Sequence, residues 1–98
     1  MPNKSAKKII TISLGGSQII PNDINLKFLR EFKKIIKAHT HKYKFIIVCG
    51  GGSIARKYIN ALREEKISEK LQSFSGIGAT RMNARFMAYF FNLELNQG

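Results

Sequence analysis

The sequence has little cysteine and no long apolar run, and each shortage excludes a class of protein. A single cysteine among 98 residues cannot form an internal disulfide, which excludes a disulfide-stapled framework. No apolar segment is long enough to span a bilayer. The apolar segment after the basic amino terminus stops at a glycine pair, too early for a signal peptide. We therefore expect a cytoplasmic protein with no membrane partner.

Acidic residues are also scarce. Six Asp and Glu stand against seventeen Lys and Arg, which gives a formal net charge of +11. Such an excess suits nucleic acid, an anionic membrane or a phosphorylated small molecule, and charge alone does not choose among them. At this length the chain has room for one small domain, which can bind a ligand but cannot easily enclose two.

The first half of the sequence alternates strand and helix patterns. The β-branched run 9–14 predicts a strand that ends at a glycine pair, and the unbroken apolar run 45–49 predicts a strand covered on both faces. After a turn at residues 21–23, apolar residues recur every three or four positions over 26–39, which is typical of an amphipathic helix. We expect two parallel strands joined by this helix, with Cys49 as a small buried hydrophobe.

Two further helices follow in the pattern. The first spans about residues 53–65, and its inner side is predicted to consist of Ile54, Tyr58, Ile59 and Leu62. A short polar linker, 68–75, with room for one helical turn, then leads to a helix over about 79–92. The apolar side chains of this last helix cover far more than one face. We therefore expect it to pack against a partner subunit or against a segment that this chain lacks.

Two glycine-rich turns, each directly after a predicted strand, carry the candidate chemistry. They contain Gly15, Gly16 and Ser17 in the first turn and Gly50, Gly51 and Gly52 in the second. Ligands of open α/β sheets bind beyond the carboxyl ends of the strands. Glycine leaves no Cβ between a backbone amide and a phosphate, and a following helix directs free N–H groups at an anion. Neither turn matches a dinucleotide-binding or P-loop fingerprint.

Arg56 strengthens the phosphate hypothesis. It lies with Lys57 in the first turn of a predicted helix, where the helix dipole repels a cation by about 0.3–1 kcal/mol. An anion on the glycine turn would compensate, with the guanidinium forming a planar fork to its oxygens. The alternative is that both side chains are solvated and the glycines only form a tight turn. We interpret His39 and His41 as surface residues, because a metal site needs at least three protein ligands.

Three motifs, in order and spacing, resemble a known family. They are ISLGGS at residues 12–17, VCGGGSIARKY at 48–58 and GIGATRMNA at 76–84. Together they are similar to the first part of an archaeal-type uridylate kinase of the amino acid kinase superfamily. The resemblance implies an α/β fold: a partial three-layer α/β/α sandwich with a parallel sheet. Residues 1–98 would form a single partial domain, the amino-terminal, acceptor-side half, without the carboxy-terminal ATP-binding half.

The resemblance also implies an activity and roles for residues. The activity is phosphorylation of UMP to UDP by ATP with Mg²⁺, in a homo-hexamer. The first turn would face the transferred phosphates, Gly51 would contact UMP, and Gly52 and Arg56 would hold phosphate where ATP and UMP meet. The segment from Gly76 would lie near the acceptor nucleotide and the subunit interface. No catalytic residue or metal ligand is implied, and the implied nucleotide-binding set is Gly15, Gly16, Ser17, Gly50, Gly51, Gly52, Arg56, Ser73, Gly76 and Thr80.

The sequence departs from the family in three respects. Ser73 stands where the family usually has an Asp that accepts hydrogen bonds from the UMP ribose, and a hydroxyl is a weaker acceptor than a carboxylate. Ser13 stands where many superfamily members have a Lys, although archaeal-type uridylate kinases often lack it. Complete members are more than twice as long. Because phosphoryl transfer needs both phosphates positioned, we expect half a site to bind weakly and to catalyse negligibly.

Two other functions stay open. A small basic nucleic-acid-binding module would suit the net charge and would lose affinity steeply with salt. Its lysines, however, lie mainly on one helix face and the amino-terminal tail, without the interleaving of aromatic and basic residues that single-strand binders have, so nucleic acid is the less favoured partner. The other alternative is a superfamily member with a different phosphate or carboxylate acceptor, against which residues 79–84 favour a uridylate kinase.

Overall fold

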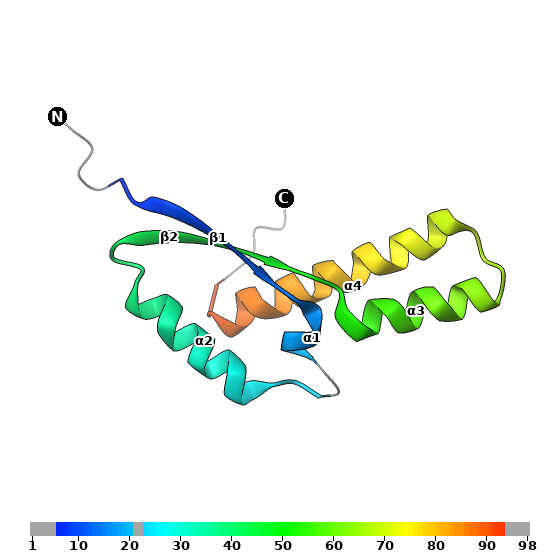
Figure 1. Ribbon diagram of the computed structural model, residues 1–98, viewed down its shortest axis with the longest axis horizontal. Coiled ribbons are helices and arrows are strands. Elements are labelled where there is room, and N and C mark those ends of the chain that lie inside the picture. Colours follow the sequence, from blue (N-terminus) through cyan, green and yellow to red (C-terminus); the bar gives the residue numbers. More distant parts are fainter. Residues whose placement is uncertain (1–5, 21–22, 94–98) are drawn as a thin grey trace.

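The computed structural model describes residues 6–20 and 23–93 and has an α/β fold, as predicted. Its elements are β1 (Lys8–Leu14), α1 (Gly16–Ile19), α2 (Leu26–Ala38), β2 (Tyr43–Cys49), α3 (Gly52–Glu64) and α4 (Glu69–Phe90). Figure 1 shows α3 and the first half of α4 as a helical hairpin that projects away from the strands. We call residues 52–82 the arm, and the remaining described residues the body.

The two strands pair in parallel, as the crossover helix between them predicted. The register runs from Lys8 opposite Tyr43 to Leu14 opposite Cys49. β2 begins two residues earlier than expected. Only one face of β2 is covered by the described residues, since Ile46 and Val48 on the other face are 45% and 51% exposed. The expectation of a strand covered on both faces is therefore wrong for the described part of the chain.

The core of the body lies between the covered sheet face, α2 and the carboxyl end of α4. α2 begins at its N-cap Asn25, whose side chain accepts a hydrogen bond from the Phe28 backbone N–H at 3.3 Å. At the other end of the core, the Lys33 ammonium donates to the Phe90 carbonyl at 2.8 Å and lies over its ring. The buried members of the core cluster are Leu14, Ile19, Leu29, Cys49 and Met87, with Phe28, Phe32, Ile47, Phe86, Phe90 and Phe91 packed against them.

α1 is a short helix where the sequence predicted only a tight turn. It spans Gly16–Ile19, and its last residue, Ile19, is fully buried in the core. The isoleucine anchors the first glycine turn to the body because its side chain fills the core beside Leu29. Of the predicted turn that follows, Pro21 and Asn22 lie outside the described residues.

α4 begins where the sequence predicted a polar linker. Residues 68–75 are not a linker: Ser68 is the N-cap of a 22-residue helix, and its hydroxyl accepts from the Leu71 backbone N–H at 3.3 Å. The helix continues through Gly76 and Gly78, since a glycine in a helix costs only about 1 kcal/mol and packing against α3 offsets it. Met82 of this helix is 67% exposed within the described residues, and the expected contact with a partner subunit or a further segment stays a prediction.

The observed bounds of α3, Gly52–Glu64, agree with the predicted range, but its buried side chains differ from those predicted. Tyr58 is 53% exposed, and the buried residue is the small Ala55. The reason is the close packing of the hairpin: a Cβ added to Gly76 of α4 would lie 3.1 Å from the Ile59 Cδ1. A large ring cannot fit in so narrow a contact. His39 and His41 are both exposed on the surface of the body.

Candidate nucleotide site

The two glycine turns meet at the carboxyl ends of the paired strands and contact each other through their backbones. A Cβ built on Gly16 would lie 2.3 Å from the Gly52 nitrogen, and one built on Gly52 would lie 2.6 Å from the Gly16 carbonyl carbon. Gly52 also has a φ of 62°, in the left-handed region that favours glycine. Both glycines are therefore required by the crossing of the turns, before any ligand is considered.

The amino-terminal end of α3 is open toward this crossing. Its N-cap is Gly51, which has no side chain to satisfy the first N–H groups, and the first turn of this fully described helix contains no acidic residue. Free N–H groups and the positive end of the helix dipole attract an anion at such a position. The backbone of the second turn therefore has the chemistry of a phosphate site.

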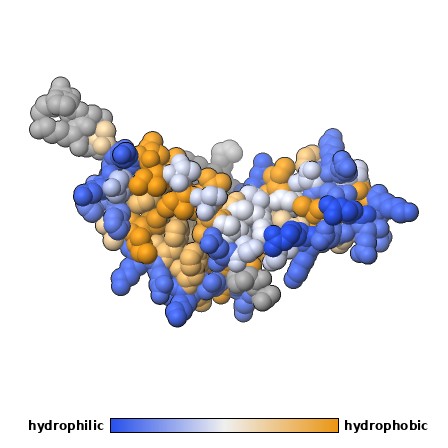
Figure 2. Space-filling model, in the orientation of Figure 1, coloured by the Kyte–Doolittle hydropathy of each residue, from blue (hydrophilic) through white to orange (hydrophobic). Residues whose placement is uncertain are grey.

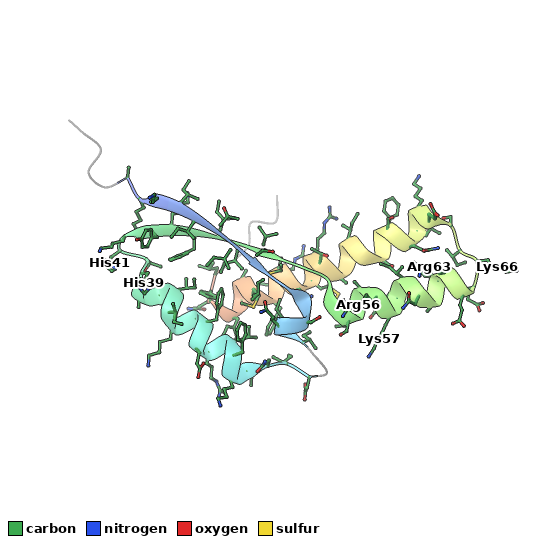
Figure 3. The ribbon with its side chains drawn as sticks, in the orientation of Figure 1. His39, His41, Arg56, Lys57, Arg63 and Lys66 are labelled. Atoms are coloured by element: carbon green, nitrogen blue, oxygen red, sulfur yellow. The ribbon has the colours of Figure 1, made fainter. Side chains whose placement is uncertain are left out.

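Arg56 bridges the two turns. Its guanidinium donates a hydrogen bond to the Ser17 hydroxyl at 3.2 Å, and both side chains are exposed. Figure 3 places Arg56 and Lys57 together in the first part of α3. The partner that Arg56 has in the described structure is a neutral hydroxyl, so its repulsion by the helix dipole is not compensated there by a carboxylate. The positive charge of Arg56 therefore lies beside the free N–H groups of α3.

Asn83 of α4 supports the second turn through a hydrogen bond to its backbone. It was not among the site residues predicted from the sequence. It is 5% exposed, and its Nδ2 donates to the Gly50 carbonyl at 2.8 Å. A buried amide needs such a partner. The signal that could have found it is a polar residue on an apolar stripe, since Ala79, Asn83 and Met87 are the buried residues of α4.

Four predicted residues share a hollow between α3 and α4. The hollow has a volume of about 510 Å³ and is lined by Gly51, Ala55, Ser73, Gly76, Ile77, Thr80 and Arg81. Gly51 is also the N-cap of α3, so it joins the hollow to the crossing of the turns. A side chain at Gly51 would collide with Ala55 and approach the Thr80 hydroxyl at 3.2 Å. Glycine at this position keeps the hollow open.

The structure thus divides the predicted residues into two groups. Gly16, Ser17, Gly50, Gly52 and Arg56 contact one another at the crossing, and Gly51, Ser73, Gly76 and Thr80 line the hollow. Gly15 lies at the start of α1, where a Cβ would make only ordinary contact with Gln18. Its backbone N–H is already bonded to the Gln18 side chain at 3.1 Å. Gly15 is therefore the predicted residue with least contact with the others.

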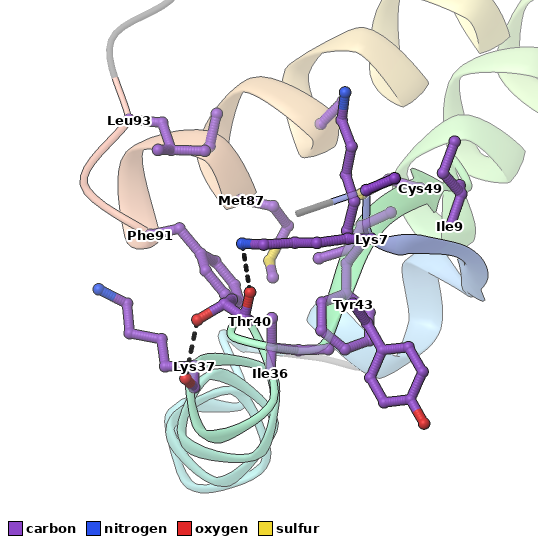
Figure 4. Close-up of a pocket in the computed structure, with 16 residues that line it drawn as sticks. Lys7, Ile9, Ile36, Lys37, Thr40, Tyr43, Cys49, Met87, Phe91 and Leu93 are labelled. Atoms are coloured by element: carbon purple, nitrogen blue, oxygen red, sulfur yellow. Dashed lines mark hydrogen bonds between the residues drawn. The ribbon is translucent and has the colours of Figure 1, made fainter. Parts of the chain in front are cut away.

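A larger groove of about 890 Å³ opens on the body, and none of the predicted site residues lines it (Figure 4). It is lined mainly by apolar side chains, among them Tyr43, Met87 and Phe91. Cys49 lies in its wall and is 6% exposed, which confirms the predicted small buried hydrophobe. Burial raises the pKa of its thiol, so the sulfur is held as a neutral group rather than a reactive thiolate.

The described residues do not fit a magnesium ion held by the protein. Mg²⁺ in phosphoryl-transfer sites is bound through one or two carboxylates together with substrate phosphates. Neither residue group of the site contains a carboxylate, and residues 6–20 and 23–93 hold no cluster of three His, Cys, Asp or Glu side chains suited to a metal. No step of the chemistry is therefore assigned to a metal here. Within the same residues, no helix has the length and apolarity to cross a membrane.

Comparison with known proteins identifies the family. The sequence matches the amino acid kinase family over residues 8–96, nearly the whole chain. The chain belongs to the amino acid kinase family. Among curated members, the uridylate kinases of Thermoplasma acidophilum and Thermoplasma volcanium are 45% and 48% identical to it over 80 residues, which cover 81% of this chain. Those residues are only 34% of either relative, so this family member spans about a third of their length.

A solved structure of an amino acid kinase family member has the same fold. The uridylate kinase from Archaeoglobus fulgidus superposes with a TM-score of 0.69 at 38% sequence identity. The superposition covers 84% of this chain and 36% of that one. The parallel strands, their crossover helix and the α3–α4 hairpin are therefore an arrangement that this family uses.

Proposed function

We propose that this chain forms the acceptor side of a uridylate kinase, which transfers a phosphoryl group from ATP to UMP and releases UDP and ADP. The observation that carries the proposal is the hollow lined by Gly51, Ser73, Gly76 and Thr80, which opens beside the free amino-terminal end of α3. The matching relatives from the two Thermoplasma species are uridylate kinases, which supports UMP as the acceptor.

In this proposal the crossing of the turns binds the phosphate of the nucleotide, and the hollow binds its ribose and base. The UMP phosphate lies at the free N–H groups of α3 and takes the Arg56 guanidinium from the Ser17 hydroxyl, because the phosphate is an anion that the planar guanidinium can bond through two oxygens, whereas the hydroxyl is a single neutral acceptor. The ribose and base occupy the hollow, where the exposed Ser73 hydroxyl accepts from the ribose. The first turn, with Gly15, Gly16 and Ser17, faces the phosphoryl group being transferred.

The remaining parts of the proposal concern the whole enzyme. ATP and Mg²⁺ are its expected co-substrate and ion, and the residues of this chain contribute to UMP and to the transferred phosphate. A cytoplasmic homo-hexamer, with residues 1–98 as one partial domain, belongs to the same proposal. Positioning and charge neutralisation account for most of the catalysis of phosphoryl transfer. We therefore expect UMP binding by this chain to be measurable and catalysis by it to be negligible.

Titration with UMP, followed by backbone amide NMR, tests the proposal. We expect the amides of residues 50–56 to shift, with a dissociation constant in the millimolar range for a half-site. Arg56→Ala should weaken binding by about tenfold, the value of one lost charge-assisted hydrogen bond of roughly 1.5 kcal/mol. Failure of UMP to shift the amides of these residues in the folded chain would exclude an acceptor site.

Ser73→Asp distinguishes a nucleotide site from a general anion site. A carboxylate at this position accepts ribose hydrogen bonds more strongly, so UMP should bind more tightly. The same negative charge should weaken binding of inorganic phosphate. Asn60→Asp, on the exposed side of α3, carries the matched change in net charge and should weaken both ligands slightly. If Ser73→Asp weakens UMP and phosphate equally, the hollow does not hold the ribose.

A further inference from the structure

Asn83 is a polar side chain in the middle of the buried, otherwise apolar side of α4. It lies between Ala79 and Met87, which are the other buried residues of this helix. Asparagine is a poor helix former, and burial of an amide costs free energy unless new hydrogen bonds replace those to water. An apolar residue would therefore serve better if the position only packed the helix. Such a departure from the local rules is expected at a functional site.

The Asn83 side chain contacts the backbone of the second glycine turn. Its Nδ2 donates to the Gly50 carbonyl at 2.8 Å and lies 3.5 Å from the Gly51 carbonyl oxygen, a longer and weaker contact. Both neighbours are acceptors, so the amide nitrogen rather than the amide oxygen must face them. Gly50 is also held on its other side, where its N–H donates to the Leu14 carbonyl at 3.0 Å. The sheet and α4 together fix the start of the turn.

A fixed carbonyl also fixes the direction of the N–H group in the same peptide unit. The peptide bond is planar and, within the described residues, always trans, so its C=O and its N–H point in opposite directions. The Gly50 carbonyl points toward Asn83 of α4, and the N–H of Gly51 therefore points away from α4. The longer contact to the Gly51 carbonyl favours the same direction for the N–H of Gly52, but more weakly.

The backbone of the turn brings these two N–H groups together in an anion-binding shape. Gly51 has a φ of −84° and a ψ of −25°, in the right-handed helical region, and Gly52 has a φ of 62°, in the left-handed region. Two successive residues of this kind form a nest, a concave arrangement of N–H groups that binds anions. Among residues 6–20 and 23–93, neither N–H has an acceptor. Both are therefore available to a ligand.

We propose that Asn83 is a positioning residue, whose amide holds the Gly50 carbonyl toward α4 so that the N–H groups of Gly51 and Gly52 stay directed at a phosphate. The inference rests on the proposed function insofar as it takes a phosphate as the ligand of the turn. Asn83 is 5% exposed and acts through the backbone, without touching the ligand itself. Without its hydrogen bond, a peptide unit between two glycines is free to rotate, and the N–H groups lose their common direction.

A positioning role differs from a merely structural one in its effect on affinity. Loss of the Asn83 hydrogen bond lowers the stability of the fold in either case. Well below the thermal midpoint nearly every molecule stays folded, so lower stability alone leaves the dissociation constant of a ligand unchanged. The matched control is Ile36→Val on α2, which shortens a core side chain that is 5% exposed and lowers stability without contact with the turn. A change in affinity confined to Asn83 variants therefore reports the direction of the N–H groups.

Titration of the full chain with inorganic phosphate, followed through the backbone amide NMR signals of Gly51 and Gly52, tests the inference. Asn83→Ala should raise the phosphate dissociation constant about tenfold, as expected when one hydrogen bond to a charged group is lost. It should also shift the Gly51 signal before any phosphate is added, which Ile36→Val should not do. Asn83→Asp keeps the shape but presents an acceptor to the carbonyl, so it should weaken binding further. Asn60→Asp carries the same change in charge at an exposed position and should weaken binding only slightly.

Three results would overturn the positioning role. They are a phosphate constant within about twofold of the wild type in Asn83→Ala, an equal loss of affinity in Ile36→Val, and no shift of the Gly51 and Gly52 signals when phosphate is added to the wild type. If thermal unfolding shows that Asn83→Asp does not fold, Asn83→Ala alone decides. The proposed function is judged separately, with UMP on the wild type. If phosphate binding depends on Asn83 but UMP binds no more tightly than phosphate, the positioning role stands and the uridylate kinase site does not.

Discussion

The body and the arm are held together by different kinds of contact. In the body, large aromatic and aliphatic side chains surround Leu29 and Ile19, which are fully buried. In the arm, α3 and α4 contact through small residues such as Ala55 and Gly76, and large side chains such as Phe74 remain exposed. Figure 2 shows the same contrast, with a broad apolar area over the body and isolated apolar patches among charged side chains on the arm.

The difference indicates that the body contributes most of the stability, whereas the candidate site lies where the body and the arm meet. A close-packed core gains free energy from every buried methylene, so the body contributes most of the stability. The arm buries little large apolar surface, yet it presents the hollow on one side and exposed apolar side chains of α4, such as Phe74 and Met82, on another. Paired substitutions, one in each region, can break or sharpen this contrast.

The largest contrast is expected between two truncations to alanine. Leu29→Ala removes a fully buried side chain and should lower the free energy of unfolding by about 2–5 kcal/mol. Phe74→Ala removes a larger side chain that is 55% exposed and should change it by no more than about 0.5 kcal/mol in the monomer. Urea unfolding followed by circular dichroism, at a concentration where the chain is monomeric, measures both. Equal losses would show that the arm has a core of its own.

The second contrast compares the same glycine-to-alanine change at two positions, where we expect opposite effects on the stability of the chain. Gly16→Ala places a Cβ against the Gly52 backbone and should destabilise the chain by about 1–3 kcal/mol or more. Gly78→Ala meets no described atom and should stabilise the monomer by up to about 1 kcal/mol through helix propensity. Thermal unfolding of the two variants decides the matter. A loss at Gly78 would mean that the glycine has a role within the monomer.

A third contrast compares two asparagines. Asn83→Ala removes the buried donor to the Gly50 carbonyl and should cost about 1 kcal/mol, the lower end for an unsatisfied group because that carbonyl is only half-buried. Asn60→Ala removes an exposed partner of Arg63 and should stay within about 0.5 kcal/mol. If Asn83→Ala also leaves the free energy of urea unfolding unchanged, water takes the place of the Asn83 amide as the donor to the Gly50 carbonyl.

The smallest effect concerns the pH dependence of the body. Because burial raises the pKa of the Cys49 thiol, the folded state favours the protonated form. Its contribution is fully present below the unfolded thiol pKa of about 8.5 and is lost as the pH rises through the higher folded value. Urea midpoints should therefore fall more steeply with rising alkaline pH in the wild type than in Cys49→Ala. Parallel curves for the two proteins would contradict the raised pKa.

The sequence predicted those parts of the fold that depend on local patterns. The period of the apolar residues in α2 and the β-branched run of β1 each contain the whole signal for their element. The start of α4 was missed because Gly76 and Gly78 resemble a break, while the N-cap role of Ser68 depends on a single hydroxyl. The exposure of Tyr58 depends on how closely α4 approaches, which no local pattern records.

The site shows the same division. The two glycine turns were found from their place after the strands, and Ser73 and Thr80, which only the family resemblance indicated, line one hollow in the structure. The contact between Gly16 and Gly52 joins residues far apart in the sequence, and so does the bond from Asn83 to Gly50. Such contacts arise only when the strands have paired. The phosphate-binding roles of the turns remain predictions, to be tested with UMP.

The crossing of Gly16 and Gly52 also has a consequence for how the chain folds. A slip of β2 by one residue against β1 would move the second turn by about 3.3 Å and send alternate side chains to the wrong face of the sheet. Two backbones that leave no room for a single methyl group cannot absorb such a displacement. The turns fit together only in the native register, so a mispaired sheet cannot bring the two turns of the candidate site into contact.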